Sequence, residues 1–360
     1  MRPWIVGWMG LALSGCALHQ LATQKRAWPE QQGSIAVAGI DGPLKVIRDE
    51  LGVPHIRAST ENDALYGLGL AHAQDRLFQA DLTRRLVSGR MSEMLGARSV
   101  ELDAFALGLE LPRRATEALQ AMAPGERARV DAYVRGFNAG LASYDTLPIE
   151  YRLLGVDRVP EWTAEDCLSS AFLQSWNLSE NSRGELALMQ MEGTDWALRD
   201  EAMKFAAETG PLDPAWPELA ESLSLGRFTA GWYAWTGTFG GGVDASQASN
   251  NWVIGPSRSA DGSPIVANDP HLVQSVPSLW YAADVKGGDL HVAGVTFPGT
   301  PVVIIGHNAD IAWGLTNVMA DYVDFAVFDR VGLDAVAYGG EQVALREVEV
   351  EVEVRDSEPV

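Results

Sequence analysis

The segment at residues 247–256 divides the chain into a part with helical patterns and a part with strand patterns. Its sequence, Gln-Ala-Ser-Asn-Asn-Trp-Val-Ile-Gly-Pro, joins two small residues to a polar stretch and then to an apolar strand pattern. A serine at the start of a chain can provide its own base, because a free α-amino group has a pKa of about 7.7 to 8 and can accept the hydroxyl proton. We therefore interpret Ser249 as an internal N-terminus that cleavage after Ala248 would expose.

Helical spacing dominates the part before Ser249. From Thr60 onward, leucine and phenylalanine recur every three to four residues, and Glu61 and Asp63 place negative charge in the first turn, where a helix dipole favours it. This pattern predicts a helix that begins near Thr60. Further helices are predicted over residues 125–143, 163–178 and 182–209.

Strand patterns dominate the part after Ser249. Short apolar runs between turn residues predict strands at 252–255, 265–267, 279–285, 290–297, 302–305 and 323–331, and two more near the N-terminus at 35–40 and 44–48. Residues 348–354 alternate strictly between valine and glutamate, which predicts a strand with one apolar face. Because a partner sheet for this strand is missing, we expect the chain to be the front part of a longer protein.

The charge balance argues against a nucleic-acid partner. The chain has 27 basic and 48 acidic side chains, a formal net charge of −21, and no run rich in lysine or arginine. A phosphate backbone would be repelled over most of such a surface. Hydrophobic residues make up 47% of the chain, which is enough for a packed core.

The N-terminus carries a targeting pattern. Arg2 precedes an apolar stretch at 4–13, too short to span a bilayer, and then Leu-Ser-Gly-Cys at 13–16. This pattern resembles a bacterial lipoprotein signal, which implies removal of residues 1–15, a lipid anchor on Cys16 and a periplasmic location. Ala17 favours the outer membrane. The alternative is an ordinary signal peptide with an incidental cysteine.

Several common catalytic and metal-binding patterns are missing from the sequence. It contains no Gly-x-Ser-x-Gly elbow, no His-Glu-x-x-His, no Cys-x-x-Cys and no phosphate-binding Gly-x-x-x-x-Gly-Lys. Cys167 has no disulfide partner once Cys16 is assigned to the anchor, and we expect it to be a small, half-buried residue. We interpret His72, inside a predicted amphipathic helix, as a hydrogen-bonded structural residue and not as a ligand.

Separated motifs follow one another along most of the chain. They are Val-Ile-Arg-Asp-Glu-Leu-Gly-Val-Pro-His-Ile at 46–56, Gly-Leu-Gly-Leu-Ala-His-Ala-Gln-Asp-Arg-Leu at 67–77, Ser-Gly-Arg-Met-Ser-Glu at 88–93, Ser-Asn-Asn-Trp-Val-Ile-Gly at 249–255, Asn-Asp-Pro-His at 268–271, Gly-His-Asn at 306–308 and Ile-Ala-Trp-Gly at 311–314. In this order they resemble the penicillin acylase family of N-terminal nucleophile hydrolases. The resemblance runs from about Leu44 to the end of the chain.

The resemblance implies an α+β fold, the αββα sandwich of the N-terminal nucleophile hydrolases. A mainly helical α-chain region at 34–225 would follow a linker at 16–33. Residues 226–248, rich in glycine, tryptophan and threonine, would form a spacer that is partly excised, and 249–360 would be the first part of a C-terminally truncated β chain.

The resemblance also implies roles for three residues. Ser249 would be the nucleophile of both self-cleavage and amide hydrolysis. His271 would orient Ser249 or its amine, although a structural turn histidine is an alternative. The backbone N–H of Asn317 would donate to the oxyanion. The family also uses an asparagine side chain and an arginine further downstream, and we locate neither in this sequence.

A calcium site is implied by the segment Asp-Tyr-Val-Asp at 321–324. Asp321 and Asp324 would supply carboxylates and Val323 its carbonyl, which are the hard oxygen ligands that calcium prefers. Glu180, or Glu185 as its rival, would add a ligand from the α-chain region. The alternative is a solvated acidic turn. Trp176 could line the substrate pocket or could equally belong to the core.

The expected function is that of a self-processing acylase. It would hydrolyse a linear acyl amide of the penicillin, cephalosporin or N-acyl-homoserine-lactone type, as a heterodimer of its own α and β chains, with water as the only cosubstrate. The alternative is a catalytically incomplete lipoprotein that keeps the same fold as a binding module.

Overall fold

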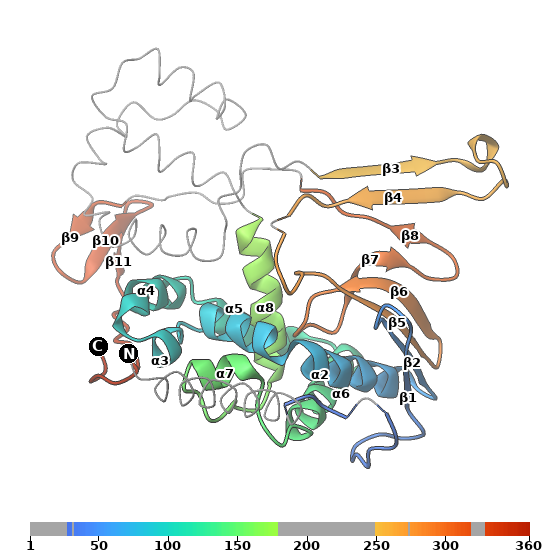
Figure 1. The fold of residues 1–360 in the computed structure, drawn as a ribbon. Coiled ribbons are helices and arrows are strands. Elements are labelled where there is room, and N and C mark those ends of the chain that lie inside the picture. Colours follow the sequence, from blue (N-terminus) through green and yellow to red (C-terminus); the bar gives the residue numbers. More distant parts are fainter. Residues whose placement is uncertain (1–26, 31, 179–248, 273, 318–327) are drawn as a thin grey trace, which may run out of the picture.

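The computed structural model describes residues 27–30, 32–178, 249–272, 274–317 and 328–360. Within these ranges, helices make up most of the part before residue 178, and strands make up the part after residue 249 (Figure 1). The predicted α+β class is confirmed. The predicted helix at 182–209 and the spacer at 226–248 lie outside the described residues.

The first two strands form a hairpin. β1 (Lys45–Arg48) pairs antiparallel with β2 (Pro54–Ala58), which confirms the strand predicted at 44–48. The strand predicted at 35–40 is wrong, because residues 34–40 form none. β1 is therefore the last strand on its side of the described sheet. The segment turns instead, and the Asp41 N–H donates to the Asp63 carboxylate at 2.9 Å.

The central helix is α2 (Glu61–Val87), which begins where the sequence predicts. The Thr60 hydroxyl accepts a hydrogen bond from the Asp63 N–H at 3.1 Å and so satisfies one free donor of the first turn. Arg84 and Arg85 lie in the last turn, where the dipole favours positive charge. Most of its residues are buried, because the sheet lies on one side and α6 on the other.

In the described part of the chain, six shorter helices accompany α2. They are α3 (Ser92–Leu95), α4 (Val100–Gly108), α5 (Leu111–Ala121), α6 (Pro124–Ala142), α7 (Ile149–Leu153) and α8 (Ala164–Asn177), with a 3-10 turn η1 (Ala97–Ser99). α6 and α8 confirm the predicted helices at 125–143 and 163–178. α8 begins with a capping box in which Thr163 and Asp166 bond each other's backbone N–H.

α2 and α6 cross at glycines, which lets the two backbones touch. A Cβ added to Gly136 would lie 1.9 Å from the Tyr66 carbonyl oxygen, and one added to Gly69 would lie 2.1 Å from the Tyr133 carbonyl oxygen. The aromatic rings of Tyr133 and Phe137 fill the core beside this crossing. Close helix packing of this kind needs residues without side chains at the contact.

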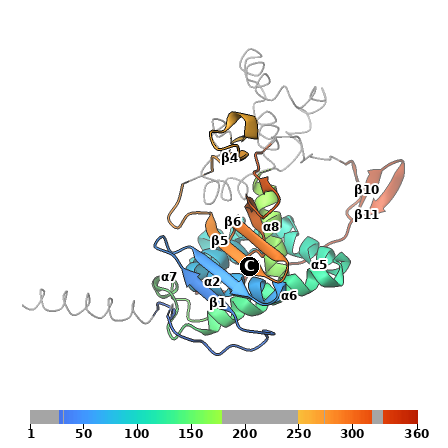
Figure 2. The same ribbon diagram turned by 90° about the vertical axis from the view of Figure 1, so that its right-hand side faces the viewer.

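The main sheet combines strands from both parts of the chain. Its order is β1-β2-β5-β6-β7-β8, with the remaining strands β5 (Tyr281–Gly287), β6 (Leu290–Thr296), β7 (Val303–His307) and β8 (Ala312–Trp313). β2 and β5 are parallel, with His55 opposite Asp284, and the other pairs are antiparallel. Tyr281, Ala283 and Val285 alternate onto the helix side and are buried in the core. Figure 2 shows the strands of this sheet beside the helical part.

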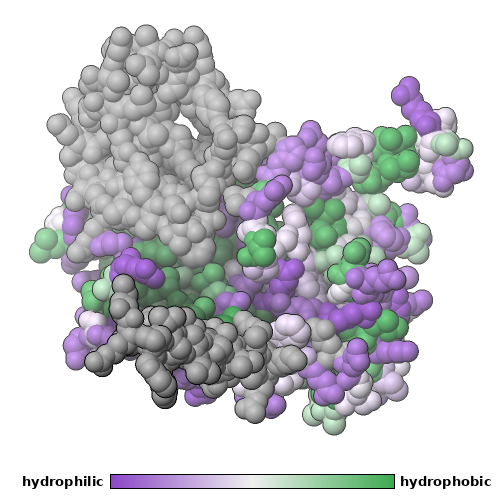
Figure 3. Space-filling view, in the orientation of Figure 1, coloured by the Kyte–Doolittle hydropathy of each residue, from purple (hydrophilic) through white to green (hydrophobic). Residues whose placement is uncertain are grey.

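The remaining strands form two small sheets. β3 (Asn250–Ile254) and β4 (Ile265–Asp269) make an antiparallel pair, with the 3-10 turn η2 (Pro256–Arg258) between them. β9 (Arg330–Val331), β10 (Ala335–Tyr338) and β11 (Glu341–Ala344) make the other. The first five strands predicted after Ser249 are therefore confirmed, and of the sixth, at 323–331, the described part contains β9. Hydrophobic side chains lie exposed on the β3–β4 hairpin (Figure 3).

The strand predicted at 348–354 is wrong. Residues 345–354 form no strand, and the valines separate instead: Val350 is 51% exposed, whereas Val352 is 5% exposed. Val352 exchanges backbone hydrogen bonds with Val360 at 2.8 and 3.0 Å, and the Arg355 N–H donates to the Ser92 carbonyl at 3.0 Å. These bonds hold the segment against α3 and replace strand pairing.

In the ranges that the structure describes, none of the helices is long and apolar enough to cross a membrane. The signal pattern at residues 1–16 lies outside those ranges.

Candidate active site

Ser249 lies at the point where the chain enters β3. Its side chain is half-buried, and its Oγ accepts a hydrogen bond from the backbone N–H of His271 at 3.2 Å. The strand register explains this contact, because Asn250 of β3 is opposite Asp269 of β4, so that the chain leaving β4 passes Ser249. The structure therefore brings together two of the three predicted catalytic residues.

The imidazole of His271 is directed at Asp269 and not at Ser249. Its Nε2 lies 2.9 Å from the Asp269 carboxylate and 3.5 Å from the Asn250 side-chain nitrogen. If Nε2 carries the proton and donates it to Asp269, the Asn250 amide cannot donate to the same atom, which fits the longer distance. The contact with the Ser249 hydroxyl is thus made by the backbone of His271.

Asn268 joins the hairpin to the segment after β8. Its side-chain nitrogen donates to the Asn250 carbonyl at 2.9 Å and to the Leu315 carbonyl at 3.0 Å, and its Oδ1 accepts from the Leu315 N–H at 2.8 Å. Gly314 is pressed against it, since an added Cβ would lie 2.8 Å from the Asn268 Cβ. The sequence gives Asn268 only as a motif member, and its bridging role needs the fold.

Asn317 follows two residues after this bridge. Its side-chain nitrogen donates to the carbonyl of Leu178, just beyond the end of α8, at 2.8 Å. The side chain of Asn317 thus attaches the segment after β8 to the helical part, while Asn268 attaches the same segment to the strand that follows Ser249. The segment that contains Asn317 is held on both sides.

The predicted calcium ligands Asp321, Val323, Asp324 and Glu180, and the rival Glu185, all lie outside the described residues. Among the described residues, no group of three or more histidine, cysteine, aspartate and glutamate side chains is arranged to hold a metal ion.

Known proteins match nearly the whole chain. The model of one protein family, described as penicillin amidase, matches residues 43–360. The chain belongs to this family.

Three curated relatives illustrate the range of the match. Penicillin acylase 2 proenzyme of Pseudomonas sp. (strain SE83) is 35% identical, over 83% of this chain and 39% of that protein. Acyl-homoserine lactone acylase QuiP of Pseudomonas aeruginosa is 33% identical, over 87% of this chain and 38% of that protein. Penicillin G acylase of Escherichia coli is 27% identical, over 78% of this chain and 39% of that protein. The chain therefore spans about two-fifths of the length of these relatives.

A solved structure, thermostable penicillin G acylase from Alcaligenes faecalis, also matches. It is 23% identical, and the match covers 48% of this chain and 96% of that chain with a TM-score of 0.34.

His72 lies in the core of this member of the penicillin amidase family, as predicted. Its ring is fully buried, Nδ1 lies 2.7 Å from the Tyr133 hydroxyl and Nε2 lies 2.8 Å from the Thr296 hydroxyl. Burial, with a smaller contribution from the charge of Arg76, lowers the pKa of His72 to about 3. The ring is therefore neutral near pH 7 and serves as a structural hydrogen-bonding group.

Cys167 and Trp176 also take structural positions. Cys167 is fully buried, which corrects the half-buried expectation, and its sulfur accepts from the Trp162 indole at 3.2 Å. Burial raises the pKa of its thiol, so it is an unreactive core residue. Trp176 packs against the core cluster that includes Leu173, which supports the core alternative.

Proposed function

We propose that this chain is the front part of a self-processing acylase in which Ser249 is the N-terminal nucleophile. The observation that carries the proposal is the contact between the Ser249 hydroxyl and the His271 N–H at 3.2 Å. A matched relative is named a proenzyme. Together these observations support a cut between Ala248 and Ser249.

The proposed self-cleavage uses the serine hydroxyl. Ser249 Oγ attacks the Ala248 carbonyl carbon and its proton passes to the peptide nitrogen, which leaves as the Ser249 amine, so that an ester joins Ala248 to Oγ. Water then hydrolyses the ester, which leaves a carboxylate on Ala248 and a free amine on Ser249. The His271 N–H fixes Oγ during attack, because its donation restricts the rotation of the side chain.

The proposed hydrolysis uses the same atom. The Ser249 amine takes the Oγ proton, Oγ attacks the acyl carbon of the substrate, and the proton passes to the leaving amine. Water then releases the carboxylic acid from the acyl-serine. We assign the Asn317 backbone N–H to the oxyanion, where one such donor is worth roughly 3 kcal/mol of transition-state stabilisation. The fixed segment around Asn317 suits this role, since a preorganised donor needs no rearrangement.

The proposed substrates are linear acyl amides, of the penicillin, cephalosporin or N-acyl-homoserine-lactone type. The relatives named above are called penicillin acylases and an acyl-homoserine lactone acylase. These names favour an enzyme over the alternative of a lipoprotein binding module. After the cut, the α and β chains would work as a heterodimer.

We propose a calcium site because the residues at 321–324 offer the oxygen ligands that calcium prefers. Asp321, Val323, Asp324 and Glu180 would hold the ion with oxygen donors, and the ion would stabilise the chain beyond β8. If so, chelation lowers the thermal stability of the processed protein, and indifference to chelation contradicts the site. We also propose removal of residues 1–15 and a lipid anchor on Cys16 at the periplasmic side of the outer membrane.

Intact mass spectrometry of the complete gene product tests the central proposal. The wild-type protein should split with Ser249 at one N-terminus and should hydrolyse acyl amides. Ser249→Ala should do neither, whereas Ser257→Ala, at an exposed serine in η2, should behave as wild type. Cleavage in Ser249→Ala would remove the autocatalytic mechanism, and an unsplit wild-type chain that binds acyl amides without turnover would support the binding module.

A further inference from the structure

The side chain of Asn268, in β4, bonds two separate segments of the candidate active site. Its nitrogen donates to the Asn250 carbonyl at 2.9 Å and to the Leu315 carbonyl at 3.0 Å, and its Oδ1 accepts from the Leu315 N–H at 2.8 Å. Both hydrogens of the nitrogen are therefore used, together with the oxygen. The amide exchanges two hydrogen bonds with Leu315, as the backbone of a neighbouring strand would.

This pairing lies at the border between two sheets. β8 is the last strand on its side of the main sheet, and β3 with β4 forms a separate sheet beside it (Figure 1). Within the described ranges, no strand ladder joins the two sheets. The position of the chain after β8 relative to β4 therefore depends on side-chain bonds such as those of Asn268.

Gly314 leaves the room that the Asn268 amide occupies. A Cβ added to Gly314 would lie 2.8 Å from the Asn268 Cβ, 2.9 Å from its Oδ1 and 2.9 Å from the Asn251 side-chain nitrogen. A methyl group at this position would push the amide off the Leu315 backbone. The pairing thus needs an amide on one side and a residue without a side chain on the other.

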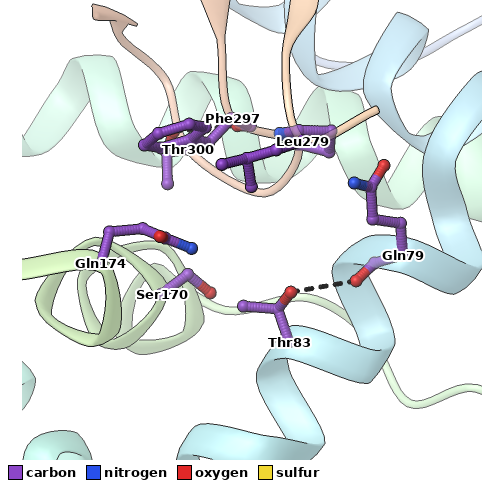
Figure 4. A pocket seen from close by; sticks show the side chains of 8 residues that line it. Gln79, Thr83, Ser170, Gln174, Leu279, Phe297 and Thr300 are labelled. Carbon is purple, nitrogen blue, oxygen red and sulfur yellow. Dashed lines mark hydrogen bonds between the residues drawn. The ribbon is translucent and has the colours of Figure 1, made fainter. Parts of the chain in front are cut away.

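The end of this segment is attached to α8. The Asn317 side chain donates to the Leu178 carbonyl at 2.8 Å. α8 is itself closely packed, since Ser170 faces Thr83 of α2 across a space of about 20 Å³, which is room for one water molecule (Figure 4). A segment that is held by Asn268 on one side and by a packed helix on the other has a defined position.

Asn268 also fixes the surroundings of Ser249. Asn250, whose carbonyl it holds, is the next residue in the chain, and the His271 N–H that donates to the Ser249 hydroxyl follows three residues after Asn268. One side chain therefore links the segment of the proposed nucleophile to the segment of the proposed oxyanion donor. Such groups have to be held within about 0.5 Å of their productive positions.

We propose that Asn268 is a positioning residue that holds the Asn317 N–H at the correct distance from Ser249 for both to act on one carbonyl group. This inference rests on the proposed acylase function and deepens it. Asn268 takes no part in the bond-breaking steps and acts through the Leu315 backbone. An aspartate of the same size could accept from the Leu315 N–H, but in its ionised form it offers no hydrogen to the two carbonyls.

The test compares Asn268→Asp with Asn308→Asp in the complete gene product. In the described part of the chain, the Asn308 side chain bonds through its Oδ1, which accepts from the Asp310 and Ile311 N–H groups at 2.9 and 2.8 Å and is kept in the variant. Asn268→Asp should lower kcat for an acyl amide roughly 10- to 100-fold and leave KM nearly unchanged, because a misplaced oxyanion donor weakens binding of the transition state alone. Asn308→Asp should change neither.

The pH dependence separates positioning from a general loss of structure. When its carboxyl group is protonated, Asn268→Asp can again donate to one of the two carbonyls, so the ratio of its kcat to that of wild type should rise as the pH falls from about 7.5 to about 5. The ratio removes changes that Asp269, His271 and the Ser249 amine cause in both proteins. Gly314→Ala, which displaces the amide without adding a carboxyl group, should lose kcat without this rise.

The outcomes keep this inference separate from the proposed function. If Asn268→Asp folds but stays unsplit, its rate of self-cleavage replaces kcat at both pH values. An unchanged kcat in Asn268→Asp, or the same ratio to wild type at both pH values, would overturn the inference. An unsplit and inactive wild type ends the acylase proposal. Deuterium uptake at the Leu315 N–H then tests the bond itself: it should be faster in Asn268→Ala than in wild type, and equal uptake would show that Asn268 does not hold the segment.

Discussion

His72 shows how one buried residue can connect both parts of the chain. Each hydrogen bond around it has one possible direction. The Thr296 hydroxyl has one proton and donates it to the Tyr281 carbonyl, so its oxygen accepts from His72 Nε2–H. The neutral ring then accepts at Nδ1 from the Tyr133 hydroxyl, whose oxygen also accepts from the Gly299 N–H. The imidazole is therefore the neutral tautomer with its proton on Nε2.

The buried imidazole predicts a loss of stability in acid. Burial lowers the pKa of His72 from 6.5 to about 3, so the unfolded chain takes up a proton below about pH 6.5 that the folded chain refuses. The stability from this group is complete above pH 6.5 and is lost as the pH falls toward 3. Between about pH 7.5 and pH 5, urea unfolding of wild type should lose about 2 kcal/mol more than His72→Gln does.

An exposed histidine provides the control for this measurement. His307→Gln, at the end of β7, should keep the wild-type slope of stability against pH. A His72→Gln protein with the wild-type slope would contradict the assignment of the effect to the buried ring.

The backbone role of His271 predicts an unusual ranking of its variants. His271→Ala keeps the N–H that donates to the Ser249 hydroxyl, whereas His271→Pro removes it. We expect self-cleavage to slow less than about tenfold in the alanine variant, the scale of one lost side-chain hydrogen bond, and to stop in the proline variant. Time-resolved mass spectrometry measures both, and equal loss would indicate that the imidazole itself is required.

At the scale of elements, the crossing of α2 and α6 depends on the absence of side chains. At Gly136, a Cβ would overlap the backbone of Tyr66, and a backbone cannot rotate away as a side chain can. The helices would have to separate, which would also loosen the packing of Tyr133 and Phe137.

Gly136→Ala should therefore destabilise the protein, although alanine is the better helix former. We expect a cost of about 1 to 3 kcal/mol in the free energy of unfolding, as for overpacked cores. Gly125→Ala in the same helix meets no atom within 4 Å and should be neutral or stabilise by up to about 1 kcal/mol. Denaturant unfolding of both variants tests this, and equal stabilities would argue against close backbone contact.

The elements that the sequence predicts are those whose signals are local. α2 and α8 have a helical period and a threonine cap, and both begin where expected. The strands predicted at 35–40 and 348–354 fail because other contacts hold these segments: the Asp41 N–H bonds Asp63, and Val352 and Arg355 bond Val360 and Ser92. A local pattern of apolar residues does not show such contacts. Ser249 and His271 were predicted from motifs, whereas Asn268 gains its bridging role from a segment distant in sequence.

At the scale of the molecule, many contacts cross the predicted cleavage point. β2 pairs with β5, His72 bonds Thr296, and the Tyr281 hydroxyl donates to the Asp75 carboxylate, which also pairs with Arg48. Several of these groups are buried, so separating the part before Ser249 from the part after it would leave buried groups without their hydrogen bonds.

The two products of cleavage should consequently stay together. After the split, both chains should elute as one particle from a size-exclusion column in native buffer and should separate only in denaturant. Thr296→Val, which removes the acceptor for His72, should lower the denaturant concentration at which they separate. Separation of the wild-type chains in native buffer would contradict the continuous sheet.

The parallel pairing of β2 with β5 has a consequence for synthesis. His55 and Asp284, which face each other across that pair, are 229 residues apart in the chain. A ribosome adds about 5 to 20 residues each second, so β2 waits roughly 10 to 45 s for its neighbour to emerge. During that time one edge of β2 is open to pairing with other chains. A cut at Ser249 in this interval would detach β2 from β5, which pairs with that edge in the structure, so the proposed maturation has to follow folding.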